Sequence, residues 1–284
     1  MKADCHVHFV LDGADFRRAI ARNAATPDTD TIREHLAACQ KAGCTFLRSG
    51  GDKWGVGLAA ARIAPEYGIE LRTPAFPICR KGNYGGFIGK SYESMKDYAA
   101  LVAEVRRSGG SFVKIMIAGI MDFDRFGVLS QPGLPGGEIR ELIHIAHGEG
   151  FSVMAHANGA ETVEAACAAG VDSVEHGAYL DGDAVAALAQ SGAVWVPTLA
   201  AIGNLRGKGR FREDAVERIL ESALENVEKC AAMGGYLAPG SDAGAWAVPH
   251  GQGMEDEYAL LRSVLGDRTE EVLNRGIGRI RAKF

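Results

Sequence analysis

Two histidines one residue apart stand close to the start of this chain, in the segment Asp4-Cys5-His6-Val7-His8-Phe9. Alternate side chains of a β-strand project to the same side, so His6 and His8 would point together. Neutral imidazole is a good ligand for zinc and other divalent metals. The pair alone leaves two hypotheses, a metal site or two hydrogen-bonded core histidines, and the rest of the sequence must separate them.

Four further residues with ligand or acid–base chemistry end short apolar segments: Lys114, His156, His176 and Asp242. Singly, each has an ordinary structural explanation. A buried histidine is usually hydrogen-bonded within the core, and an aspartate in Gly240-Ser241-Asp242-Ala243-Gly244 can form a turn. In a barrel of parallel strands, however, reactive groups gather at the carboxyl ends of the strands. Their repeated position at segment ends therefore predicts one shared site.

Lys114 lies in an apolar segment, on the same strand face as Phe112 and Met116. Burying an ammonium group without a partner is costly, and desolvation lowers the pKa of lysine towards a neutral, nucleophilic amine. A neutral amine can take up CO2 to form a carbamate, an anionic ligand whose two oxygens can bridge two metal ions. The alternative is a structural ion pair with Asp242 or Glu175.

Short apolar segments alternate with amphipathic ones along nearly the whole chain, as in repeated βα units around a parallel sheet. Strands are predicted near Ala3 to Phe9, Cys44 to Arg48, Ile69 to Phe76, Ser111 to Ala118, Phe151 to Ala157, Val171 to His176, Ala193 to Leu199 and Tyr236 to Asp242. Helices are predicted over Thr31 to Ala42, Met95 to Arg107, Glu138 to Glu149, Glu161 to Ala168 and Asp214 to Met233.

Eight such units make a (β/α)8 TIM barrel of the α/β class, and residues 1–284 are expected to form a single domain. The alternative is an open doubly wound sheet. That fold would need a glycine-rich phosphate loop after its first strand, where His6-Val7-His8 stands instead.

Composition narrows the classes of partner. The chain has a formal net charge of −5 and a pI near 5.9, with no local lysine or arginine cluster, which argues against nucleic acid. No apolar run approaches the roughly 20 residues of a membrane helix, and the first residues do not form a signal peptide. We therefore expect a cytoplasmic protein without a membrane partner. The six cysteines form no CxxC pair and are expected to be reduced.

Five motifs in this order resemble the amidohydrolase superfamily: Asp-x-His-x-His, Val113-Lys114-Ile115, His156-Ala157-Asn158-Gly159, Val174-Glu175-His176-Gly177 and Gly240-Ser241-Asp242-Ala243-Gly244. The likeness is closest to prolidase-like and imidazolonepropionase-like members, and it extends from residue 4 to about residue 260. Each motif is short, but the ordered set is specific. Most relatives carry a small β-sandwich beside the barrel. This sequence has no room for it, so we expect the barrel without the β-sandwich, either as a natural form or as a trimmed chain.

The resemblance implies a binuclear centre whose two divalent ions share a bridging hydroxide and a carbamate on the lysine. Its ligands would be His6, His8 and Asp242 for one ion, His156 and His176 for the other, and carboxylated Lys114 as the bridge. Zinc is the default metal for such histidine-rich sites, although manganese, iron, cobalt or nickel could occupy the same ligands. Asp242 would take the proton from the nucleophile and pass it to the leaving nitrogen, with His176 as the next catalytic candidate.

These features predict a metal-dependent hydrolase that cleaves a C–N bond in a small amide, cyclic amide or dipeptide-like substrate. Two alternatives remain. The same hydroxide would serve a lactonase or phosphotriesterase, and a non-catalytic metal-containing barrel would bind a ligand or partner. We expect a small-molecule substrate as the partner, and self-association into a homo-oligomer stays open.

The substrate contacts are less constrained by the sequence. The loop from Arg80 to Phe87 offers a cation and aromatics near the barrel mouth, so Arg80 or Tyr84 could hold a substrate carboxylate. A solvated, flexible loop is the alternative. Tyr179 and His250 also follow strand ends, and they are candidates for the pocket wall or for simple loop packing.

Overall fold

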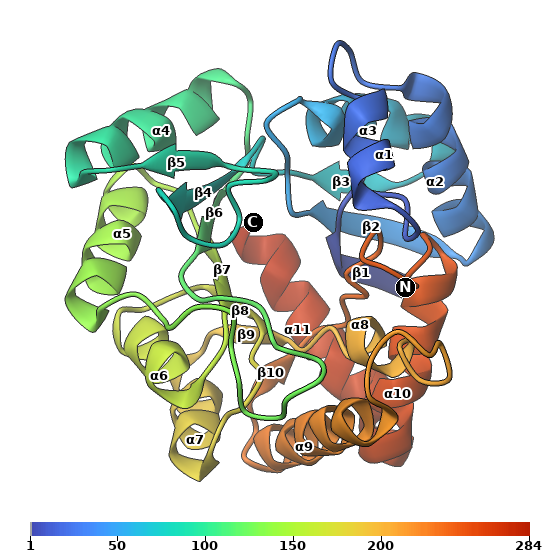
Figure 1. The fold of residues 1–284 in the computed structure, drawn as a ribbon, viewed down its shortest axis with the longest axis vertical. Coiled ribbons are helices and arrows are strands. Elements are labelled where there is room, and N and C mark those ends of the chain that lie inside the picture. Colours follow the sequence, from blue (N-terminus) through green and yellow to red (C-terminus); the bar gives the residue numbers. More distant parts are fainter. Residues whose placement is uncertain (1) are drawn as a thin grey trace.

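The computed structural model describes residues 2–284 and confirms the predicted α/β barrel fold (Figure 1). Its strands are β1 (Lys2–Val7), β2 (Cys44–Ser49), β3 (Glu70–Arg72), β4 (Pro77–Arg80), β5 (Lys90–Tyr92), β6 (Val113–Met116), β7 (Val153–Ala157), β8 (Ser173–His176), β9 (Val194–Val196) and β10 (Tyr236–Leu237). They form two parallel sheets, with the orders β1-β2-β3 and β10-β9-β8-β7-β6-β4-β5. Each segment predicted as a strand overlaps one of them.

Backbone hydrogen bonds join the two sheets along both seams. At one seam, the Cys5 N–H donates to the Pro239 carbonyl over 2.8 Å, so the segment after β10 runs beside β1. At the other seam, the chain passes directly from β3 into β4, and the Asp52 N–H donates to the Ala75 carbonyl over 2.9 Å. The strands therefore enclose a common interior.

The third predicted strand differs from the prediction in its extent. Of the predicted range Ile69 to Phe76, only Glu70–Arg72 is a strand, as β3, which pairs with β2. The next strand, β4, begins after this range, at Pro77, and pairs with β6. The chain bends between them, where Ala75 has a φ of 65°, and this left-handed conformation interrupts extended backbone. β4 and β5 were not predicted as strands, because the glycines between Gly82 and Gly89 indicate only a loop.

Helices surround the strands (Figure 1). They are α1 (Phe16–Arg22), α2 (Thr29–Lys41), α3 (Val56–Ile63), α4 (Met95–Arg107), α5 (Gly136–Gly148), α6 (Ala160–Ala168), α7 (Gly182–Ser191), α8 (Ala200–Gly203), α9 (Glu213–Ala232), α10 (Gln252–Leu265) and α11 (Thr269–Lys283), with 3-10 turns at η1 (Ala64–Tyr67) and η2 (Gly266–Arg268). Helices α2, α4, α5, α6 and α9 match the predicted ranges to within two residues at each end. In α4, for example, Tyr98, Val102 and Val105 form one buried face, as helical periodicity requires.

Helix α11 covers the end of the barrel where the strands begin. The Ser152 hydroxyl, just before β7, donates to the Lys283 carbonyl, and the Arg279 guanidinium donates to the Gly192 carbonyl, just before β9. At the opposite end of the barrel, where the strands finish, loops follow the strands. All the candidate ligands lie at that end.

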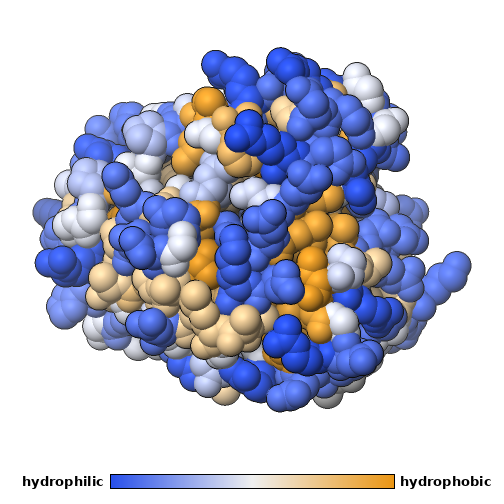
Figure 2. Space-filling view, turned by 90° about the horizontal axis from the view of Figure 1, so that it is seen from below, coloured by the Kyte–Doolittle hydropathy of each residue, from blue (hydrophilic) through white to orange (hydrophobic). Residues whose placement is uncertain are grey.

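The face seen from below in Figure 1 is mostly hydrophilic, with hydrophobic side chains showing in recesses between the polar ones (Figure 2). None of the helices in residues 2–284 combines the length and low polarity needed to cross a bilayer.

Gly276 tests the packing of α11 against the strands. A Cβ at this position would lie 1.9 Å from the Leu237 carbonyl oxygen of β10, whereas a Cβ at Gly278 of the same helix meets nothing within 4 Å. Gly276→Ala should therefore lower the free energy of unfolding by about 1–3 kcal/mol. The control Gly278→Ala should raise it by up to about 1 kcal/mol through helix propensity. Urea unfolding followed by circular dichroism measures both, and equal effects of the two substitutions would contradict this packing.

Candidate metal centre

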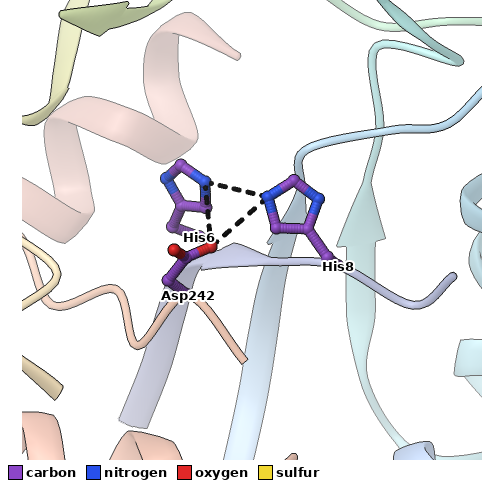
Figure 3. Close-up of side chains that lie close together, drawn as sticks. All are labelled: His6, His8 and Asp242. Carbon is purple, nitrogen blue, oxygen red and sulfur yellow. Dashed lines mark hydrogen bonds and ion pairs between the residues drawn. The ribbon is translucent and has the colours of Figure 1, made fainter. Parts of the chain in front are cut away.

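Three of the predicted ligands converge on one point (Figure 3). The Nε2 atoms of His6 and His8 lie 3.3 Å apart, and Asp242 Oδ1 lies 3.6 Å from His6 Nε2 and 3.3 Å from His8 Nε2. Within residues 2–284, these side chains form the one group of three or more histidine, cysteine or acidic donors whose ligand atoms all lie within 4.8 Å of one another. Two neutral imidazoles and a carboxylate at this spacing suit a divalent cation.

Local structure explains the convergence of these three groups. His6 and His8 project from the same side of the chain at the end of β1, and Asp242 follows β10 in a left-handed conformation with a φ of 59°. Asp4 fixes the two segments together, because its carboxylate accepts hydrogen bonds from the Ser241 N–H over 2.8 Å and from the Ser241 hydroxyl over 2.5 Å. Asp4 therefore holds the neighbouring Asp242 against the histidines.

The His6 ring is oriented from inside the barrel. Its Nδ1 lies 2.6 Å from Glu175 Oε2, which makes Nδ1 the donor and leaves the Nε2 lone pair facing the site. Glu175 also accepts hydrogen bonds from Arg48 over 2.7 Å and from the Ser173 hydroxyl over 2.6 Å. Burial raises the pKa of Glu175, while the Arg48 charge acts in the opposite direction and compensates the carboxylate.

Lys114 is buried beside this group, with Nζ 3.1 Å from His6 Nε2. Burial lowers its pKa to about 8, so a minor fraction of the amine is neutral at neutral pH, far more than for an exposed lysine. In the described part of the chain, Lys114 forms no ion pair with Asp242 or Glu175. Gly50 provides the room, because a Cβ there would lie 2.3 Å from His8 Cε1 and 2.9 Å from Lys114 Nζ.

His156 and His176 lie next to the first group, with their ring centroids 4.5 Å apart. His176 Nδ1 bonds with the Thr198 hydroxyl over 2.8 Å, and His156 Nε2 lies 3.2 Å from the Gly119 carbonyl. These contacts leave His176 Nε2 and His156 Nδ1 as the ring nitrogens available to a ligand. His176 has a φ of 68°, a second left-handed backbone at the site.

The electrostatics keep the imidazoles neutral and the carboxylate ionised. Burial lowers the pKa of His6, His8 and His156, and lowers that of His176 to about 4. Burial alone would raise the pKa of Asp242, but the hydrogen bond with His8 and the electrostatic interactions with His8, His176 and Lys114 lower it overall. Neutral imidazole and ionised carboxylate are the protonation states that bind metal ions.

Two cavities open onto these residues. One has a volume of about 490 Å³ and the other about 310 Å³, and His156, His176 and Asp242 line both. Most of their remaining lining is apolar. Such a concave, largely apolar space with a few convergent polar groups is typical of a small-molecule site.

The structure brings one of the four predicted substrate contacts, Tyr84, to both cavities. The other three lie outside the described lining. Arg80 instead forms an ion pair with Glu138 of α5, at 3.1 Å. The Tyr179 ring packs edge-on against Phe126, with centroids 5.3 Å apart.

His250 is buried away from the cavities, where its ring stacks on His35 at a centroid distance of 3.8 Å. It therefore packs against α2 rather than facing a ligand. Its position after a strand end did not distinguish these two environments.

Sequence reasoning missed four residues that line both cavities, Ile120, Arg210, Ala245 and Trp246. Trp246 lies four residues after Asp242, so its position after a strand end was an available signal. Arg210 lies in the polar segment between α8 and α9, and only the folded chain returns that segment to the barrel mouth.

Sequence comparison identifies the family. The Amidohydrolase family matches residues 3–272, so the chain belongs to the amidohydrolase family, as its ordered motifs predicted. The uncharacterized protein Rv2915c of Mycobacterium tuberculosis is 28% identical over 193 residues, which make up 66% of this chain and 51% of that protein. The uncharacterized protein Mb2939c of Mycobacterium bovis matches equally well. The chain thus spans about half the length of the curated relatives it matches.

Solved structures share the fold. A Xaa-Pro dipeptidase with bound methionine in its active site has a TM-score of 0.80 and 20% identity, with 99% of this chain and 75% of that chain covered. A prolidase complexed with N-methylphosphonate-L-proline has a TM-score of 0.75 and 21% identity, with coverages of 99% and 74%. The ochratoxinase of A. niger has a TM-score of 0.74 and 18% identity, with 99% of this chain and 70% of that chain covered. These likenesses establish the barrel architecture.

A substitution at Gly50 tests the geometry of the candidate metal centre. Gly50→Ala should displace His8 and Lys114, because the added methyl group overlaps both side chains. We expect metal affinity to fall by about 10-fold to 100-fold, the usual effect of disturbing groups that orient ligands. Titration of the metal-free protein with Zn²⁺ measures this. The control Gly137→Ala in α5 adds a methyl group to open space and should bind Zn²⁺ like the parent protein. Parental affinity in Gly50→Ala would contradict the proposed ligand positions.

Proposed function

We propose that the protein is a metal-dependent hydrolase that cleaves a C–N bond in a small amide, cyclic amide or dipeptide-like substrate. The observation that carries this proposal is the convergence of His6, His8 and Asp242 beside a buried lysine, at the mouth of an apolar cavity. Membership of the amidohydrolase family supports the same conclusion.

The donor set fits two divalent ions of the kind the family generally uses. His6, His8 and Asp242 would hold one ion, and His156 and His176 would hold the other. A carbamate on Lys114 would supply the shared anionic oxygens, since the amine is buried, partly neutral and 3.1 Å from His6 Nε2. When bound, the ions would polarise the carbonyl of the substrate and lower the pKa of a bridging water to supply hydroxide. Zinc is the metal we propose first, because imidazole and carboxylate ligands suit it.

Asp242 is the proposed proton carrier. Its contacts with the histidines run through Oδ1, which leaves Oδ2 for the reacting molecules. Its lowered pKa keeps it ionised and able to accept a proton from the attacking water. The protonated carboxyl would then donate to the leaving nitrogen, which departs as a neutral amine. His176, held by Thr198, is the next group in position to move a proton.

Substitution of Lys114 tests whether a carbamate on this residue bridges the two metal ions. Lys114→Met removes the amine but keeps most of the side-chain volume, so the bound metal should fall from two ions per chain to one, with loss of amide hydrolysis. Elemental analysis of the purified protein and hydrolysis of N-acyl amino acids measure the two effects. Short carboxylic acids should restore part of the activity in Lys114→Ala, where they can enter the vacated space. Two ions and parental turnover in Lys114→Met would exclude the carbamate.

Asp242 tests the catalytic role. Asp242→Asn keeps an oxygen ligand but cannot accept a proton, so kcat should fall by about 100-fold to 10,000-fold while most of the metal is retained. Steady-state kinetics on N-acyl amino acids and dipeptides, with metal analysis of the same samples, separate the two properties. Parental kcat in a fully metallated variant would assign the proton transfer to another group.

A further inference from the structure

Arg210 is a cation at the mouth of the site and has no acidic partner among residues 2–284. It lines both cavities, where Asp242 is the one carboxylate among the described lining residues. The two other arginines of the same segment are paired, Arg206 with Glu217 at 3.8 Å and Arg212 with Asp214 at 2.6 Å. Arg210 has no such ion pair within the described chain. A charged group with this placement is available to a ligand.

Aromatic rings hold the Arg210 side chain in place. Its guanidinium carbon lies 4.6 Å from the ring centroid of Trp246 and 5.3 Å from that of Phe211. Stacking on an aromatic face leaves the edge of the guanidinium, with its N–H donors, free to bind a planar anion. This arrangement limits the side-chain entropy that binding would otherwise cost.

Both cavities provide apolar space beside the candidate metal centre. The larger one is walled by Leu11, Phe16, Phe87, Ile88 and Met116. The smaller one is walled by Met121, Phe123, Ala201, Leu205 and Phe211. Because His156, His176 and Asp242 belong to both walls, a molecule whose scissile bond is held at these residues can extend into each cavity.

We propose that the substrate is an amide with an apolar group on each side of the scissile C–N bond and a carboxylate that binds to Arg210. This inference rests on the proposed function and names its substrate class. Arg210 is then a specificity-determining residue. It takes the role that the sequence suggested for Arg80, whose guanidinium is paired with Glu138. Lys114, the other cation of the lining, is buried beside His6 and belongs to the centre itself.

Three compounds with one skeleton test the proposal. N-benzoyl-2-phenylethylamine is neutral, N-benzoyl-L-phenylalanine carries a carboxylate on the amine half, and N-(4-carboxybenzoyl)-2-phenylethylamine carries it on the acyl half. For at least one anionic compound, kcat/KM should exceed that of the neutral compound by about 10-fold to 100-fold, the usual value of a charge-assisted hydrogen bond. In Arg210→Gln that ratio should fall to near one, chiefly through KM.

Arg206→Gln is the matched control, because Arg206 lies in the same segment, is paired with Glu217 and lines neither cavity. It should keep the parental ratio. Hydrolysis of all three compounds at equal efficiency, or an unchanged ratio in Arg210→Gln, would overturn the role of Arg210 and leave the hydrolase proposal standing.

A binding measurement separates the two proposals. If none of the three compounds is hydrolysed, the result counts against the proposed function, and calorimetric titration of the metal-loaded protein with the two anionic compounds decides the inference. Tighter binding of either one by the parent protein than by Arg210→Gln would support the carboxylate contact. Equal affinities of the two proteins for both compounds would exclude it.

Discussion

The hydrogen bond between Glu175 and His6 is the constraint on which the site depends. A carboxylate buried inside a barrel is costly unless it is fully compensated, and here Arg48 and Ser173 supply the compensation on one side and His6 on the other. Arg48 is itself buried, with its guanidinium 4.5 Å from the ring centroid of Phe284. One polar network thus connects the covered end of the barrel with the candidate ligands at its open end.

Two residues of the candidate centre have strained backbone conformations. His176 and Asp242 have φ values of 68° and 59°, and residues other than glycine in this region typically cost about 1–3 kcal/mol each. Hydrogen bonds at and beside these two residues offset the cost. The Trp195 indole donates to the His176 carbonyl over 2.9 Å, and Asp4 binds Ser241 beside Asp242. The strands can therefore present both side chains in orientations that an unstrained turn would not provide.

Much of the fold and of the candidate centre was predictable, because both follow from local patterns. A buried parallel strand is a short apolar run, so a histidine, lysine or aspartate that ends one stands out. The strand-end positions predict one shared site, and the resemblance to the amidohydrolase superfamily implies that His6, His8 and Asp242 share one ion. The structure brings the ligand atoms of these three side chains together. The early end of the third predicted strand at Arg72 was not predictable in this way, because the chain bends at Ala75, which has a left-handed backbone conformation that no local motif indicates.

The sequence by itself determined the family, the parallel barrel and the residue types at the ends of its strands, because hydrophobic periodicity and short ordered motifs indicate these properties directly. Only the tertiary structure decided which cations face the cavity. Arg80 meets Glu138 from a helix 58 residues further along, while Arg210 finds no acidic partner among the described residues and stacks on Trp246. Such pairings depend on distances between segments remote in sequence, and the chain must fold before they exist.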